Sequence, residues 1–80
     1  MEVGINTYLK NLGKNVAKIR KRKNLSQYQL AKDIFTDQSN LARIEKGEVN
    51  PTVKTLLKIS SALGCEMKEL FDFEPNTPKK

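Results

Sequence analysis

The stretch that decides the fold is LSQYQLAKDIFTDQSNLARIEKG, which occupies residues 25–47. Ser26 is a favoured N-cap residue, and Gln29 stands three positions later, where its side chain can complete a capping box. Three apolar residues then follow at the spacing of one helix face, namely Leu30, Ala31 and Ile34. The pattern predicts a helix from Gln27 to about Ile34.

A second, more polar helix is expected after a turn at residues 34–36. Asp37 is predicted to cap it, the helix runs over residues 38–46, and Gly47 ends it. The residues expected on or beside its outer face are Gln38, Ser39, Asn40, Arg43 and Lys46. Amides and guanidinium groups can pair with the edges of adenine and guanine. On this helix alone, an ordinary solvated polar face is an equal alternative.

Three further helices are predicted from the apolar spacing outside this stretch. The first runs from about Thr7 to Lys23, with Asn6 as its N-cap. The fourth covers residues 53–63, and a short fifth covers about 67–71. Each helix has one apolar face, so the chain is predicted to form a five-helix, all-α domain around one core.

One acidic residue is expected close to that core. Glu45 falls near the buried side of its helix, beside Leu41. An unpaired charge there would be costly, so the carboxylate needs a partner. Arg20, at the edge of the first helix's apolar face, is the best candidate for a structural ion pair, and a contact between Arg20 and a phosphate also stays open.

Positive charge is concentrated in the N-terminal half of a chain whose net charge is +6. The segment 10–23 contains no acid and these basic residues: Lys10, Lys14, Lys18, Arg20, Lys21, Arg22 and Lys23. The asymmetry favours a polyanionic partner, although a solvated lysine-rich face explains the charge equally well. A membrane surface is disfavoured because the basic helix lacks a broad exposed apolar face.

A chain of 80 residues is one domain at most. We expect the domain to span residues 6–73 and residues 74–80, with two prolines and no large apolar side chain, to form a flexible tail. No segment has the length and hydrophobicity of a membrane span. Residues 1–10 lack the basic start and the apolar run that a signal peptide requires. We therefore expect a cytoplasmic protein.

Enzymatic chemistry is disfavoured by the residues that the chain lacks. Cys65 is the only cysteine and there is no histidine, which excludes a zinc finger and leaves the thiol without an imidazole to activate it. There is also no glycine loop for phosphates. We expect no enzymatic activity, no metal and no cofactor.

The C-terminal part of the domain is rich in large apolar residues, namely Met67, Leu70, Phe71 and Phe73. Such an excess in a small domain is typical of a homodimer surface. The alternative, closure of the monomer's own core, is about as well supported for each residue.

The chain contains six short runs in order: LSQYQLA at 25–31, LARIEKG at 41–47, NPT at 50–52, LLKI at 56–59, ALG at 62–64 and LF at 70–71. Together they resemble the lambda-repressor/Cro family of helix-turn-helix proteins, the xenobiotic-response-element type. The match extends from about Leu9 to Phe71. It implies a lambda-repressor-like domain in which the second and third helices form a helix-turn-helix that binds DNA.

The resemblance also implies a division of DNA contacts. The third helix would lie in the major groove, where the base-reading residues would be Gln38, Ser39, Arg43 and Asn40. Phosphates would be bound by Gln27, Lys46 and Asn50, with further contacts from Lys23, Arg22 and Arg20. The Arg20–Glu45 pair matches a structural pairing typical of the family.

Two positions depart from the family pattern. Phe35 stands where the turn usually has glycine, so it must accept left-handed backbone geometry or shift the turn. Its ring would either pack against the fourth helix or lie exposed. Asp37 stands where a small hydroxyl residue is common, and it is a good cap that could also accept a hydrogen bond from cytosine.

The resemblance implies a transcriptional regulator, acting as a repressor or autoregulator, that binds a near-palindromic double-stranded DNA operator as a homodimer. Phage repressors, Cro-like proteins, restriction–modification controllers and antitoxins all stay open. An antitoxin or a protein-interaction adaptor with the same fold is the alternative, and its protein partner would be a toxin or a polymerase.

Overall fold

The computed structural model describes residues 4–74, which form five α-helices and, within that range, no strand. In chain order they are α1 (Ile5–Arg22), α2 (Gln27–Asp33), α3 (Gln38–Lys46), α4 (Val53–Leu63) and α5 (Met67–Leu70). The all-α, five-helix prediction is confirmed. The expected tail, apart from Glu74, lies outside the described residues. Between residues 4 and 74, no helix combines the length and hydrophobicity that a membrane span requires.

Helices α2 and α3 begin where their capping residues predict. The Ser26 hydroxyl accepts from the Gln29 backbone N–H at 3.0 Å, and the Gln29 side chain accepts from the Ser26 N–H at 2.9 Å, which completes the capping box. Asp37 caps α3 by accepting from the backbone N–H of Asn40. Gly47 ends that helix in the left-handed conformation, with φ 77°.

The first helix differs from its prediction. It begins at Ile5, and Gly4 is the N-cap without a side-chain cap. The backbone N–H of Tyr8 donates to the Gly4 carbonyl at 3.1 Å, so Asn6 already lies within the first turn and cannot cap it. At the other end of the helix, Lys23 is the C-cap.

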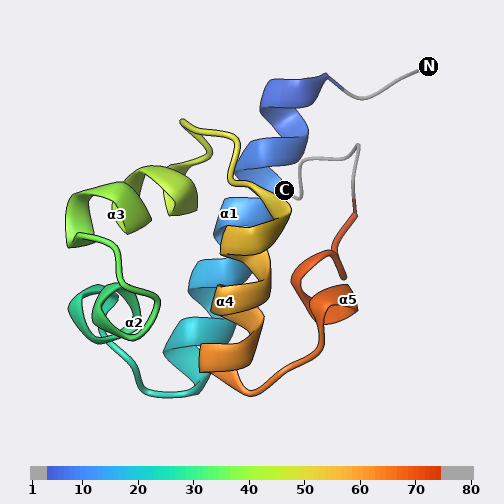
Figure 1. The fold of residues 1–80 in the computed structure, drawn as a ribbon. Helices are drawn as coiled ribbons and strands as arrows, with labels where there is room; N and C mark the ends of the chain where they lie inside the picture. Colours follow the sequence, from blue (N-terminus) through green and yellow to red (C-terminus); the bar gives the residue numbers. More distant parts are fainter. Residues whose placement is uncertain (1–3, 75–80) are drawn as a thin grey trace.

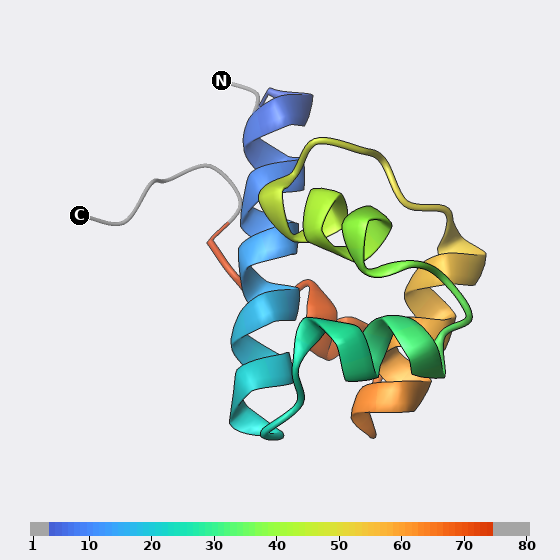
Figure 2. The same cartoon turned by 90° about the vertical axis from the view of Figure 1, so that its left-hand side faces the viewer.

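All five helices contribute to one core. Figure 1 shows α2 and α3 on one side of α1 and α4, with α5 on the other side. In Figure 2, α1 and α4 stand apart, and α2 and α3 lie across the space between them. That space is filled by the buried residues Leu12, Val16, Ile19, Leu30, Ala31, Ile34, Leu41, Leu56, Ile59, Leu63 and Leu70.

A glycine allows α3 to lie directly against α1. A Cβ atom built on Gly13 would collide with the backbone carbonyl oxygens of Ile44 and Glu45. The absence of a side chain at this position therefore sets how closely the two helices approach. The approach fixes α3, which carries the polar outer face, to the longest helix of the domain.

The turn between α2 and α3 places Phe35 in the left-handed backbone conformation, which a bulky side chain disfavours. Phe35 adopts φ 59° and is 89% exposed. The backbone N–H of Thr36 donates to the Ala31 carbonyl at 2.9 Å, a helix-ending bond that requires the residue before Thr36 to be left-handed. The Phe35 ring lies in solvent, so little packing offsets the strain of the left-handed backbone.

Candidate nucleic-acid interface

The outer face of α3 is polar and accessible. Leu41 and Ile44 point into the core, which turns the other side of the helix outward. The exposed residues on that side are Gln38, Ser39, Arg43 and Lys46. Asn40 is half-buried, and its Nδ2 donates to the Thr36 hydroxyl at 2.9 Å.

A shallow hollow adjoins the first half of this face. It is lined by Phe35, Thr36, Asp37, Ser39, Asn40 and Arg43. The structure thus brings three of the four predicted base readers to one surface, and the fourth, Gln38, lies exposed on the same helix. Donors and acceptors occur together there, as recognition of base edges requires.

The N-terminus of α2 lies beside the same face. Gln27, the first residue of α2, donates from Nε2 to Glu45 Oε1 at 2.9 Å. Gln38 donates from its own Nε2 to Gln27 Oε1 at 3.4 Å. A primary amide carries two N–H groups, and Glu45 engages one of those on Gln27. The other is the group that a phosphate contact at this residue would use.

The predicted ion pair between α1 and α3 is present. Arg20 binds Glu45 through two parallel hydrogen bonds, from Nε at 2.7 Å and from Nη2 at 3.0 Å. The two side chains are only 8% and 6% exposed. Two charges are tolerated in a protein interior when they are paired and hydrogen-bonded, and this pair is both.

The same geometry bears on the expectation that Arg20 reaches a phosphate. Its Nη1 donates to the Leu25 carbonyl at 2.8 Å, so all three guanidinium nitrogens have protein partners. These bonds use three of the five guanidinium N–H groups and Arg20 is only 7% exposed, so the guanidinium is held in the ion pair and offers little surface to a phosphate. The structural role of Arg20 is therefore observed, and a phosphate contact from Arg20 stays a prediction.

Four of the other predicted phosphate contacts are exposed, namely Arg22, Lys23, Lys46 and Asn50, whereas Gln27 is half-buried. Arg22 and Lys23 lie at the end of α1, just before the loop that leads to Gln27. Lys46 is the last residue of α3, and Asn50 lies in the loop before α4. These positions border the helix-turn-helix, as the assignment of phosphate contacts requires.

The expected dimer surface at the C-terminal end is corrected at one residue. Leu70 is 0% exposed and belongs to the monomer's core, so it cannot contact a second chain. Met67, Phe71 and Phe73 are half-buried against that core. The Tyr8 ring packs on Phe73 with 5.1 Å between centroids, which covers part of the same surface from α1.

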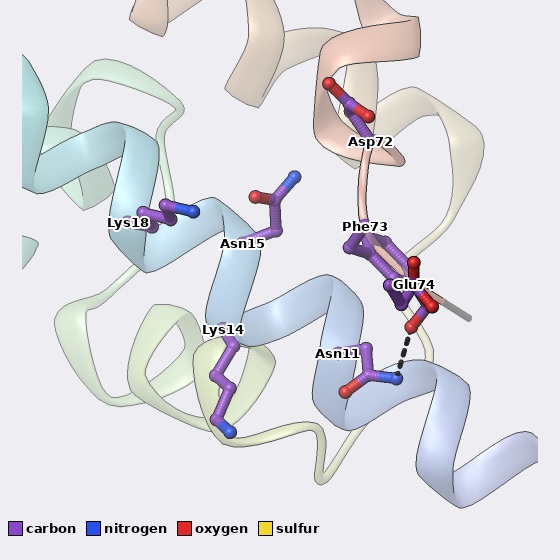
Figure 3. Close-up of a pocket in the computed structure, with 7 residues that line it drawn as sticks. All are labelled: Asn11, Lys14, Asn15, Lys18, Asp72, Phe73 and Glu74. Atoms are coloured by element: carbon purple, nitrogen blue, oxygen red, sulfur yellow. Dashed lines mark hydrogen bonds between the residues drawn. The ribbon is translucent and has the colours of Figure 1, made fainter. Parts of the chain in front are cut away.

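A separate hollow lies between α1 and the segment that follows α5 (Figure 3). Its lining residues are Asn11, Lys14, Asn15, Lys18, Asp72, Phe73 and Glu74. The Asn11 side chain donates to the Glu74 carbonyl at 3.2 Å across it. In Figure 1, α5 and α3 lie on opposite sides of the molecule, so this hollow is not part of the polar face of α3.

Two features of the site were missed by the sequence analysis. Gln27 contacts α3 through Glu45 and Gln38, and no local pattern indicates a bond between residues so far apart in sequence. Gly13 was not interpreted, although a glycine inside a helix is unfavourable by about 1 kcal/mol relative to alanine and therefore suggests a packing constraint.

Comparison with known proteins finds relatives that are named as regulatory proteins. The chain is 42% identical over 64 residues to the HTH-type transcriptional regulator SlrR of Bacillus subtilis, covering 79% of this chain and 42% of SlrR. It is 39% identical over 62 residues to the control protein C.BamHI of Bacillus amyloliquefaciens, covering 76% of each. The chain thus spans less than half of SlrR but about three quarters of the control protein.

Solved structures agree with the fold. The restriction-modification controller protein C.AhdI from Aeromonas hydrophila superposes with a TM-score of 0.77 at 35% identity, covering 79% of this chain and 96% of that one. The model of the helix-turn-helix family HTH_3 matches residues 16–70, which include α2, α3 and α4. The chain therefore belongs to this helix-turn-helix family of DNA-binding transcriptional regulators, which are not enzymes.

Proposed function

We propose that this chain binds a specific double-stranded DNA site as a homodimer and regulates transcription as a repressor or autoregulator in the cytoplasm. The observation that carries the proposal is the exposed polar face of α3, with Gln38, Ser39 and Arg43 on it. This helix would enter the major groove and α2 would cross the backbone. Asn40 would be a fourth base reader through its second Nδ2 N–H or its Oδ1, neither of which the bond to Thr36 uses.

The phosphate contacts proposed around α3 are Gln27, Lys46, Asn50, Lys23 and Arg22. Each cationic contact displaces counterions, so binding would weaken steeply as salt is added. The backbone N–H groups at the start of α2 favour an anion at the same place. These contacts would fix the register of the protein on the duplex without reading its sequence.

A homodimer follows from the size of the reading face. One short helix reads only a few base pairs, and two copies related by a two-fold axis would place two recognition helices about 34 Å apart on one face of the duplex. The operator would then be near-palindromic. Met67, Phe71 and Phe73 stay in the proposed dimer surface through their exposed parts, whereas Leu70 is excluded by its burial.

The proposal is tested by gel shifts on DNA from upstream of the chain's own gene and on random DNA, over a series of salt concentrations. We expect a specific complex on one duplex that survives more salt than the complex on random DNA. Equal binding to both duplexes at every salt concentration contradicts autoregulation through a site in that upstream DNA. A protein-interaction adaptor or antitoxin acting only through a protein would give no specific DNA complex at all.

Two substitutions separate base reading from phosphate binding. Gln38→Ala should cost about 1–3 kcal/mol on the specific site and little on random DNA, because the lost contact is to a base. Lys46→Ala should weaken binding to both duplexes alike and reduce the salt dependence. If Gln38→Ala leaves specific binding unchanged, the reading face is assigned wrongly.

A further inference from the structure

The hollow between α1 and the segment after α5 carries opposite charges on its two walls. Lys14 and Lys18 stand on the α1 wall, and Asp72 and Glu74 stand on the other wall (Figure 3). All four residues are exposed, and none of them forms an ion pair within residues 4–74. Opposite charges that line one space without pairing can each attract the complementary group of a ligand.

One residue of this hollow presents a hydrogen-bond acceptor in a fixed orientation. Asn15 is 9% exposed, and its Nδ2 donates to the carbonyls of Glu69 and Leu70 at 2.9 and 2.8 Å. A reversed amide would place its oxygen against two acceptors, so the orientation is held. Asn15 Oδ1 accepts no hydrogen bond within residues 4–74 and is not sealed from solvent, so it opens into the hollow. A ligand that covers this oxygen must supply an N–H or O–H donor.

Phe73 gives the hollow an aromatic surface. The ring is half-buried, and the Tyr8 ring packs against it with 5.1 Å between centroids and 61° between planes. This contact holds the Phe73 ring in place and leaves part of it facing the hollow. Aromatic rings bind other rings in tilted or offset arrangements. A ligand therefore gains contact area here when it carries an aromatic group.

These groups lie within the reach of one small molecule. Lys18 follows Asn15 by three residues on α1, which makes the two side chains neighbours about 5–6 Å apart on the helix surface. Figure 3 shows the Lys18 side chain directed toward Asn15. The bonds from Asn15 to the last carbonyls of α5 fix the start of the segment that carries Asp72 and Phe73.

We propose that this hollow binds a free amino acid with an aromatic side chain. The carboxylate of the amino acid would pair with Lys18. Its ammonium group would donate to Asn15 Oδ1 and to Asp72, and its ring would pack on Phe73. A ligand with only one of the two charges would be repelled by the wall of like charge.

A second hollow shows why the buried amide decides the assignment. It lies between the end of α2 and α4 and also combines both signs of charge with an aromatic ring. Its lining residues are Asp33, Phe35, Lys54, Leu57, Lys58, Ser61 and Ala62. Its polar residues are all exposed, so none of them is held in position by burial. We therefore place the amino acid beside α5 and use the second hollow as the control.

The experiment titrates the full chain at neutral pH with three related compounds and follows the protein by NMR. L-phenylalanine carries both charges, 3-phenylpropionate lacks the ammonium group, and 2-phenylethylamine lacks the carboxylate. A ligand with about a dozen non-hydrogen atoms is expected to bind at about 1 mM, so each titration runs to about 10 mM. We expect L-phenylalanine to shift the Asn15 side-chain amide and the Phe73 backbone amide saturably, and the other two compounds to bind about three- to tenfold more weakly.

Two variants assign each charge to its wall. Lys18→Gln should weaken the binding of L-phenylalanine and 3-phenylpropionate but not that of 2-phenylethylamine, which has no carboxylate. Asp72→Asn should weaken the binding of L-phenylalanine and 2-phenylethylamine but not that of 3-phenylpropionate. Both positions are exposed, so both variants should fold. Lys58→Gln and Asp33→Asn make the same charge changes in the second hollow and should leave all three affinities unchanged.

Each alternative result overturns the proposed site. One is that L-phenylalanine gives no saturable shift at Asn15 or Phe73. Another is that all three compounds bind equally, which would indicate apolar contact alone. A third is that Lys18→Gln or Asp72→Asn leaves the affinity for L-phenylalanine unchanged. None of these results bears on DNA binding, because α3 and α5 lie on opposite sides of the molecule (Figure 1).

Discussion

Substituting Gly13 by alanine separates two opposite physical expectations. Inside a helix, alanine is favoured over glycine by about 1 kcal/mol, so helix propensity alone predicts a more stable protein. The structure predicts the reverse, because the added methyl group would overlap the backbone carbonyls of Ile44 and Glu45. Backbone atoms cannot rotate away as a side chain can, so α1 and α3 would have to separate.

The expected magnitude follows from the two contributions. Overpacking a close-packed interior costs about 1–3 kcal/mol, and contact with backbone puts this site at the upper end. After subtraction of the propensity gain, Gly13→Ala should lower the free energy of unfolding by about 2 kcal/mol. For a domain of this size, that loss lowers the melting temperature by about 8–16 °C.

The assay is urea unfolding followed by helical circular dichroism, with the melting temperature measured in parallel. Lys14→Ala is the matched control, because Lys14 is the exposed neighbour of Gly13 in the same helix. Its effect should stay within about 0.5 kcal/mol. An equal or higher free energy of unfolding for Gly13→Ala would refute the account of how α1 and α3 are packed.

Three further predictions concern single residues. Phe35→Gly should raise the free energy of unfolding by about 0.5–1 kcal/mol, because relief of left-handed strain exceeds the added flexibility of the unfolded chain, and a lower value in urea unfolding contradicts this. Asn15→Ala should lower it by about 1–3 kcal/mol, because Asn15 Nδ2 donates to the Glu69 and Leu70 carbonyls, and an unchanged midpoint contradicts this. Burial, with the charge of Glu69, raises the pKa of the Cys65 thiol, so iodoacetamide should alkylate Cys65 at pH 8 more slowly than it alkylates free cysteine, and a faster rate contradicts this.

The helix boundaries that depend on local chemistry were predictable from the sequence. Ser26, Asp37 and Gly47 act on backbone groups a few residues away, so their effect needs no knowledge of the rest of the fold. Asn6 was wrong as a cap because the chain continues its helical hydrogen bonds back to Gly4, which lacks any capping side chain. Capping residues therefore predicted the first residue of a helix correctly only where their side chains bond to the helix backbone.

The site was predictable where it depends on one helix and less so where helices meet. The positions of Arg20 and Glu45 on their own helices were sufficient to predict the ion pair between them. The bond from Gln27 to Glu45 depends on how α2 sits against α3, which no single periodic pattern determines. The same limit applies to Leu70, because an apolar residue on a helix of one turn can face either the core or a partner.

The central claim, that the outer face of α3 reads a specific DNA sequence, is tested most directly by selection from a random pool of duplexes with the wild-type chain. The account predicts enrichment of a near-palindromic site whose two half-sites are about one helical turn apart. Recovery of duplexes that share no sequence, after repeated rounds at a salt concentration that removes non-specific complexes, would contradict it.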